Sequence, residues 1–114
     1  MKRTLLAALL LMAFAGSLKA EERIVVYNWS EYIPEGVLEE FTEETGIKVD
    51  YSTYENNEVM YSKLKLQKGK GYDIVVPSTY LVSLMRDDGL LHEIDHAKLA
   101  NIGNLSPDLM DKPY

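Results

Sequence analysis

The sequence contains no cysteine and only two histidines among its 114 residues. Without thiols the chain can form neither disulfide bridges nor thiolate metal sites, so its fold must depend on an apolar core. His92 and His96 are four residues apart, as in half of a metal site on a helix. However, no third ligand is evident, and Asp95 between them is placed to cap a helical turn. We therefore expect two surface histidines and no metal site.

Basic residues are also scarce once the first 20 residues are set aside. Three of the 12 Lys and Arg lie in residues 1–20, whereas all 18 Asp and Glu lie in residues 21–114. A chain this acidic is poorly suited to nucleic acid, whose phosphates must be neutralised by lysine and arginine. The charge is compatible with a cationic small molecule, so we expect a partner of that kind and no nucleic acid.

No apolar run is long enough to span a bilayer comfortably, which takes roughly 20 residues. The run at residues 5–14 follows Lys2 and Arg3 and precedes a stretch of mostly small residues that ends at Ala20. This order predicts a secretory signal peptide over residues 1–20, cleaved after Ala20. We expect residues 21–114 to be exported without stable membrane insertion, and the missing cysteine argues against a lipid anchor.

Short apolar runs alternate with amphipathic stretches from residue 23 onward. The apolar runs predict strands at residues 23–27, 47–51 and 72–76, the last being the most clearly buried. The amphipathic stretches predict helices that start at Pro34, at residues 56–57 and at Tyr80. This alternation is typical of βαβ units. The sequence therefore predicts an α/β fold with a βαβαβ parallel sheet in which the first strand is central.

The second predicted helix has Val59, Met60 and Leu64 among its apolar positions, so we expect these side chains to face the core. Gly46 and Gly89 are placed to end the first and third helices. These signals define where the loops between the elements begin.

Three loops follow the predicted strands, at residues 28–36, 52–58 and 77–82. Because the carboxyl ends of parallel strands share one edge, where ligands bind in open sheets, we expect these loops to meet. They contain no lysine and no arginine. They do contain four aromatic and four acidic residues: Trp29, Tyr32, Tyr54, Tyr80, Glu31, Glu35, Glu55 and Glu58.

Aromatic faces and carboxylates both attract organic cations, the first through the ring quadrupole and the second through Coulomb attraction. Helix N-termini at the same edge would favour an anion, but an anion site would usually add glycine-rich backbone or basic side chains. We therefore expect a cation. Glu31 is the best candidate to pair with it. Glu35 and Glu58 fall in or near first helical turns, where we expect them to stabilise the dipole, and Glu55 is open between the two roles.

Two other interpretations of these loops stay open on the residues alone. In one, Trp29 and Tyr32 are core aromatics at the end of a strand. In the other, two loop carboxylates serve an exported carbohydrate-active enzyme, although nothing in the spacing fixes a pair at the required separation. A nucleophilic serine is not predicted, because Ser78 has no candidate base at a telling spacing.

Several segments taken together resemble the polyamine-binding proteins of bacterial ABC importers, which are type II periplasmic binding proteins. The resemblance rests on YNWSEYIP at residues 27–34, FT at 41–42, ETGIKV at 44–49, YSTYE at 51–55 and YDIVVPSTY at 72–80. It covers essentially all of residues 21–114, and the joint pattern is far more specific than any single motif.

The resemblance implies a two-lobed protein that closes around a linear polyamine, spermidine or putrescine, and delivers it to a membrane permease from the periplasm. It implies neither catalysis nor a cofactor. Carried over by position, it implies ligand contacts from two loops: Trp29, Ser30, Glu31, Tyr32, Ser78 and Tyr80. A binder of another organic cation on the same lobe is the alternative within this class.

The resemblance also implies further ligand residues and a second lobe beyond Tyr114. We expect residues 21–114 to form a partial N-terminal lobe, roughly its first half, and the chain to be a piece of a longer protein.

Overall fold

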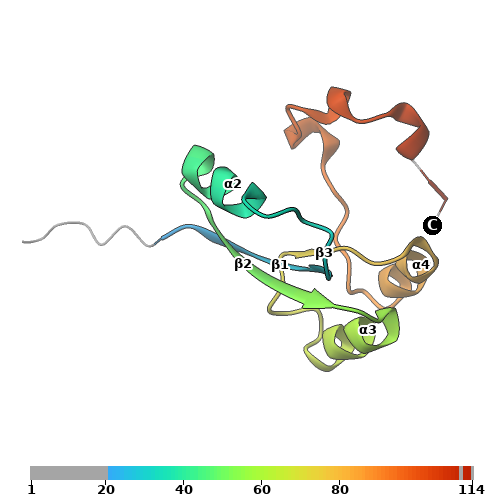
Figure 1. Cartoon of the computed structure of the whole chain (residues 1–114). Coiled ribbons are helices and arrows are strands. Elements are labelled where there is room, and N and C mark those ends of the chain that lie inside the picture. Colours follow the sequence, from blue (N-terminus) through green and yellow to red (C-terminus); the bar gives the residue numbers. More distant parts are fainter. Residues whose placement is uncertain (1–20, 111, 114) are drawn as a thin grey trace, which may run out of the picture.

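The computed structural model describes residues 21–110, 112 and 113, so the predicted signal peptide at residues 1–20 lies outside the described residues. The described part contains three parallel strands, β1 Arg23–Trp29, β2 Lys48–Tyr54 and β3 Ile74–Val75. Their order in the sheet is β2-β1-β3, with the first strand in the centre (Figure 1). The predicted α/β fold with a βαβαβ parallel sheet is confirmed.

Three α-helices connect and follow the strands in the described residues: α2 Val37–Thr45, α3 Asn57–Leu66 and α4 Thr79–Asp87. Helix α3 starts where predicted because the Asn56 side chain accepts hydrogen bonds from the backbone N–H groups of Glu58 and Val59. Beyond α4 the chain forms short 3-10 turns, η1 His96–Lys98, η2 Ile102–Asn104 and η3 Pro107–Leu109. Within these ranges, no helix has the length and apolar content needed to cross a bilayer.

Three details of the predicted elements are wrong. Helix α2 begins after Pro34 rather than at it, because Gly36 precedes the helix in a left-handed conformation with a φ of 89°. Val59 is 62% exposed, since Met60 takes the inward position and successive helical residues point about 100° apart. Strand β3, expected to be the most buried, is a two-residue edge strand in which Ile74 is 47% exposed.

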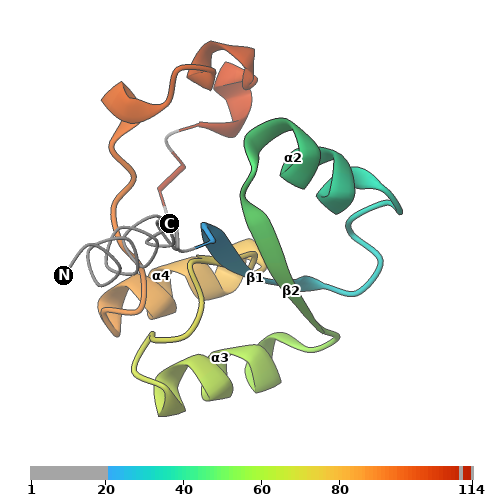
Figure 2. The same ribbon diagram turned by 90° about the vertical axis from the view of Figure 1, so that its left-hand side faces the viewer.

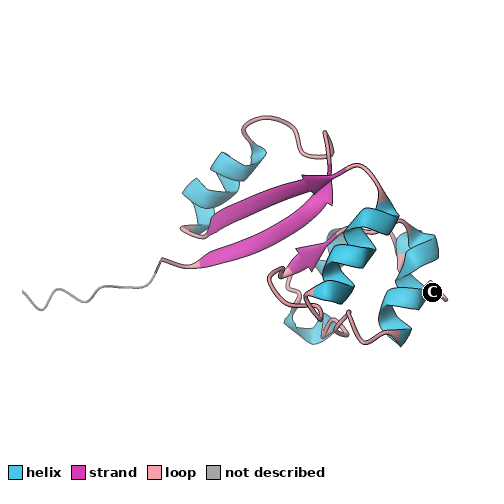
Figure 3. Ribbon diagram, turned by 90° about the horizontal axis from the view of Figure 1, so that it is seen from below, coloured by secondary structure: helices cyan, strands magenta, loops and turns pink. Residues whose placement is uncertain are grey.

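The registers of the sheet bring the ends of the strands to one edge. Trp29 is opposite Tyr54, so β1 and β2 end side by side, and Tyr27 is opposite Val75 of β3. Figure 3 shows the three strand arrows pointing the same way. The loops that leave these strands therefore lie at the same edge of the sheet, as the sequence predicts.

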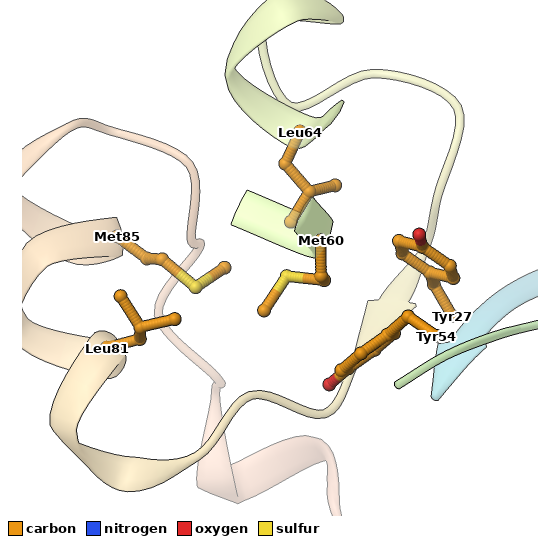
Figure 4. Close-up of a cluster of buried hydrophobic side chains, with 6 residues drawn as sticks. All are labelled: Tyr27, Tyr54, Met60, Leu64, Leu81 and Met85. Atoms are coloured by element: carbon orange, nitrogen blue, oxygen red, sulfur yellow. The ribbon is translucent and has the colours of Figure 1, made fainter. Parts of the chain in front are cut away.

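The core lies between the sheet and helices α3 and α4. Its buried side chains come from β1, β2 and both helices: Tyr27, Tyr54, Met60, Leu64, Leu81 and Met85. Figure 4 shows Met60 between the two α4 side chains and the two tyrosine rings. Met60 and Met85 are fully buried, which is where the flexible, polarisable thioether side chain fills irregular space well.

Helix α2 lies on the other side of the strands from α3 and α4 and is packed less closely (Figures 1 and 2). None of its residues is buried. An open groove of about 410 Å³ lies between α2 and β2, lined by Leu38, Glu39, Thr42, Glu43, Lys48, Val49 and Asp50.

Candidate ligand-binding site

The first of the three loops begins while the chain is still in the sheet. Trp29 is the last residue of β1 and is half-buried. The next backbone N–H, that of Ser30, donates to the Tyr54 carbonyl at 3.1 Å, and the Ser30 hydroxyl lies 3.5 Å from the same oxygen. These contacts fix the start of the loop against the end of β2.

Glu31 follows in a left-handed backbone conformation, with a φ of 63°. This conformation is costly for a residue with a side chain, by about 1–3 kcal/mol, and such strain is concentrated at functional sites. Glu31 is exposed, and Tyr32 beside it is 65% exposed. The loop therefore presents a carboxylate and a phenol ring to solvent at the end of the sheet.

Five aromatic rings form a continuous row that ends at this loop. Consecutive centroids are 4.5 Å apart from Tyr72 to Tyr27, 4.9 Å from Tyr27 to Tyr54, 4.7 Å from Tyr54 to Trp29 and 6.1 Å from Trp29 to Tyr32. These separations are those of favourable aromatic pairs. The row supports the half-buried indole from within and leaves the outer ring exposed.

The inner end of the row already carries a cation of the protein. The Lys63 ammonium lies 4.6 Å from the Tyr27 ring centroid and 5.2 Å from that of Tyr72. The neighbouring Tyr72 hydroxyl raises the pKa of Lys63 above its ordinary value. These rings therefore hold an alkylammonium group by their faces, which is the chemistry expected of the outer end.

The third loop is tied to the middle loop through Asn57. Its side-chain N–H donates to the Ser78 hydroxyl at 2.9 Å, and its side-chain oxygen accepts from the Ser78 backbone N–H at 3.2 Å. Ser78 directly precedes α4 and makes no capping bond with its own side chain. Its hydroxyl oxygen thus keeps a second lone pair for a ligand N–H.

Tyr80 lies in the first turn of α4, after the third strand. Its ring is 63% exposed, and its hydroxyl donates to the Glu58 carboxylate at 2.8 Å. That hydrogen bond raises the pKa of Tyr80. Glu58 thus holds a phenol of the third loop in addition to lying in the first turn of α3, where a carboxylate stabilises the dipole.

The structure brings both groups of predicted ligand residues to one edge by bonding each to the middle loop. Ser30 is hydrogen-bonded to Tyr54 of the middle loop. Ser78 and Tyr80 are hydrogen-bonded to Asn57 and Glu58 of the same loop, respectively. The sequence predicts for Asn57 only a part in capping the second helix, together with Asn56. The two adjacent asparagines are a signal for a further role of Asn57, because Asn56 alone is enough to cap α3.

The side chains at this edge are of the types that the sequence predicts for an organic cation. In the described part of the chain, no three His, Cys, Asp or Glu residues gather as a metal site. His92 and His96 are both exposed, as predicted. The three loops offer ring faces, hydroxyls and carboxylates without a basic side chain.

Several curated proteins with similar sequences are named as spermidine/putrescine-binding periplasmic proteins. The chain is 60% identical over 88 residues to the spermidine/putrescine-binding periplasmic protein of Escherichia coli K12, a match that covers 77% of this chain and 25% of that protein. It is 53% identical over 114 residues to the protein of the same name from Salmonella typhimurium LT2, covering 98% of this chain and 33% of the relative. The chain thus spans a quarter to a third of the length of these relatives.

Solved structures agree with this relationship. A putative spermidine/putrescine ABC transporter protein from Listeria monocytogenes matches with a TM-score of 0.75 and 42% identity, covering 81% of this chain and 28% of that one. The spermidine/putrescine ABC transporter substrate-binding protein PotD from Streptococcus pneumoniae matches with a TM-score of 0.71 and 43% identity, covering 78% and 27%. The fold described above is therefore that of ABC transporter substrate-binding proteins.

One protein-family model, described as hypothetical lipoprotein (MG045 family), matches residues 1–107. The chain belongs to the MG045 family, and its curated homologues include periplasmic spermidine/putrescine-binding proteins.

Proposed function

We propose that this chain is part of the periplasmic solute-binding component of an ABC importer for polyamines. The observation that carries the proposal is the edge of the sheet, where the rings of Trp29, Tyr32 and Tyr80 and the carboxylate of Glu31 gather without a lysine or arginine in the three loops. The names of the relatives, which specify spermidine and putrescine, point to the same class of ligand.

The proposed site works by attraction alone. Alkylammonium groups such as those of polyamines stay charged at neutral pH, as lysine does. Ring faces attract these charges and cover the methylenes between them, while Glu31 adds a Coulomb term. The hydroxyls of Ser30 and Ser78 accept N–H groups. No bond is made or broken, so the proposal includes neither catalysis nor a cofactor.

The finer parts of the proposal follow the resemblance. Residues 21–114 would form a partial N-terminal lobe, residues 1–20 an export signal, and a membrane permease would receive the ligand. Closure of a second lobe over the edge would complete the site, as in hinge-type binding proteins. Additional ligand groups would come from that lobe.

The affinity of the edge alone can be bounded. Three aromatic contacts contribute about 1–2 kcal/mol each. Exposed carboxylate pairs add about 0–1 kcal/mol, and association costs several kcal/mol in lost motion. Micromolar binding needs about 8 kcal/mol. We therefore expect residues 21–114 to bind polyamines with a Kd in the millimolar range or weaker.

The test is an NMR titration of the mature chain with putrescine, using butane-1,4-diol as the control ligand. The diol has the same carbon chain and two hydrogen-bonding ends but no charge. Putrescine should shift the amide signals of residues 28–32 and 77–80, and the diol should not. Equal shifts from both ligands would contradict a cation site, and shifts from a neutral sugar alone would favour the carbohydrate-active alternative.

Two variants of the edge and one matched control sharpen the test. Glu31→Gln removes the proposed partner charge, and Tyr32→Ala removes an exposed ring with little loss of packing. Each should weaken putrescine binding about threefold to tenfold, the equivalent of roughly 1 kcal/mol. Glu44→Gln, an equally neutralising change on exposed α2, should leave it unchanged. Equal effects from Glu31→Gln and Glu44→Gln would reduce the interaction to bulk charge.

A further inference from the structure

Tyr54, in the middle loop, contacts Trp29 of the first loop with its ring and Val76, the residue before the third loop, with its hydroxyl. It ends β2, and it is only 5% exposed. We infer that Tyr54 is a positioning residue that sets the distance between the two ligand-bearing loops. For its effect on affinity, this inference rests on the proposed function.

The first loop is attached to Tyr54 in two ways. The Tyr54 carbonyl accepts the Ser30 backbone N–H at 3.1 Å. The Tyr54 ring packs against the Trp29 indole, with centroids 4.7 Å apart and planes inclined by 52°. A change in the position of this ring would therefore move the proposed ligand face of the indole.

The third loop is attached through the hydroxyl at the other end of the same ring. The Tyr54 hydroxyl donates to the Val76 carbonyl, one residue beyond β3 and two before Ser78. Strand β3 has only two residues, so the sheet itself holds little of this segment. The Val76 backbone N–H donates to the Tyr27 carbonyl at 3.2 Å, and the Tyr54 hydroxyl bond prolongs that attachment toward the loop.

The environment of Tyr54 restricts its ring and keeps its hydroxyl protonated near neutral pH. Its ring meets Tyr27 edge to face, with centroids 4.9 Å apart, within the core cluster of Figure 4. Burial raises the pKa of the Tyr54 hydroxyl to about 12. The hydroxyl thus remains a donor throughout the physiological range, and the ring has little freedom to turn.

A purely structural role predicts a different behaviour from a positioning role. A core tyrosine that only packs would lose stability on mutation without changing the geometry of the edge. A positioning tyrosine would change the environment of residues 77–80 when its hydroxyl alone is removed, because the ring and its packing remain in Tyr54→Phe.

The experiment compares Tyr54→Phe with Tyr61→Phe in the full chain. The Tyr61 hydroxyl also donates a hydrogen bond, to Asp88 at the C-terminal end of α4, so both variants lose one phenol bond. Tyr54→Phe should shift the amide signals of residues 77–80, speed their hydrogen exchange, and weaken putrescine binding about threefold to tenfold. Tyr61→Phe should do none of these. Unchanged signals and exchange at residues 77–80 in Tyr54→Phe would overturn the inference.

The readouts separate this inference from the proposed function. If the parent chain does not bind putrescine, the proposed function fails, while the ligand-free amide signals still decide the role of Tyr54. Should Tyr54→Phe not fold, exchange of the Tyr54 hydroxyl proton in the parent chain serves instead. The free energy of opening obtained from its exchange should match that obtained from the Ser78 amide proton, since both open with the same loop, and different opening free energies would overturn the inference.

Discussion

The two sides of the sheet differ in how firmly they are packed. On one side, α3 and α4 bury Met60, Leu64, Leu81 and Met85 against the tyrosines of the strands. On the other, α2 buries none of its residues and leaves an open groove beside β2. The residues that hold the candidate site together, Tyr54 and Asn57 among them, belong to the firmly packed side. The scaffold of the site is thus the sheet together with α3 and α4.

The composition of the helices explains the difference. Helix α3 places Met60 and Leu64 four residues apart, and α4 does the same with Leu81 and Met85, so each has a buried stripe. Helix α2 has Leu38 and Phe41 at the spacing of a stripe, but both remain half-buried. Glu39, part of its acidic first turn, lines the open groove.

The largest loss of stability should come from truncating a side chain on the firmly packed side of the sheet, compared with a truncation on the α2 side. Met60→Ala should lower the free energy of unfolding by about 2–5 kcal/mol, because it leaves a cavity among fully buried neighbours. Leu38→Ala, at the groove beside α2, should cost about 1 kcal/mol. Urea unfolding followed by circular dichroism measures both. Equal losses would mean that α2 is packed as firmly as α3 and α4.

A smaller effect should appear at high pH. Tyr54 has a folded-state pKa of about 12 against an ordinary value of 10.0, so the unfolded chain loses this proton first. The stabilisation is complete below pH 10 and is lost as the pH rises toward 12, by about 2 kcal/mol in all. The stability gap between the parent and Tyr54→Phe should therefore shrink over this range in urea titrations. A constant gap would contradict the burial of the hydroxyl.

The smallest effect should have opposite signs for stability and for binding. Glu31→Gly relieves a left-handed conformation and should stabilise the chain by about 1 kcal/mol, while it weakens putrescine binding. Lys68 provides the matched control, because it has a φ of 54° at the end of α3, away from the ligand edge. Lys68→Gly should raise stability similarly and leave binding unchanged. Loss of binding in both variants would remove Glu31 from the site.

Much of the fold could be predicted from the sequence because its signals are local. The apolar runs and the helix caps predict the element order, and the βαβ rule predicts β1 in the centre. The exposure of β3 could not be predicted, because YDIVV has the composition of a buried strand. Burial depends on what packs against a strand, which the strand's own residues do not encode.

The candidate site was predictable at the level of its loops and not at the level of its bonds. The loops follow from the strand ends, and that placement brings Trp29, Ser78 and Tyr80 to one edge. The bonds from Tyr54 to Val76 and from Asn57 to Ser78 join residues 22 and 21 positions apart. They depend on strand register and on rotamers. The adjacent asparagines indicate that one of the two amides is not needed for the cap, but no local signal identifies its partner. The role of the proposed ligand residues remains a prediction.

The row of rings has an optical consequence. Trp29 is the only tryptophan in the sequence, and it stands in ring contact with Tyr54 and Tyr32, with Tyr27 and Tyr72 next along the row. Excitation energy absorbed by a tyrosine passes to a nearby indole by dipole coupling, which is efficient at such short separations. Light absorbed along the row therefore emerges as Trp29 fluorescence, at the residue where the proposed ligand would rest. The folded chain therefore contains an intrinsic fluorescent probe, in which tyrosines of the strands and of the neighbouring loops absorb light and Trp29 emits it.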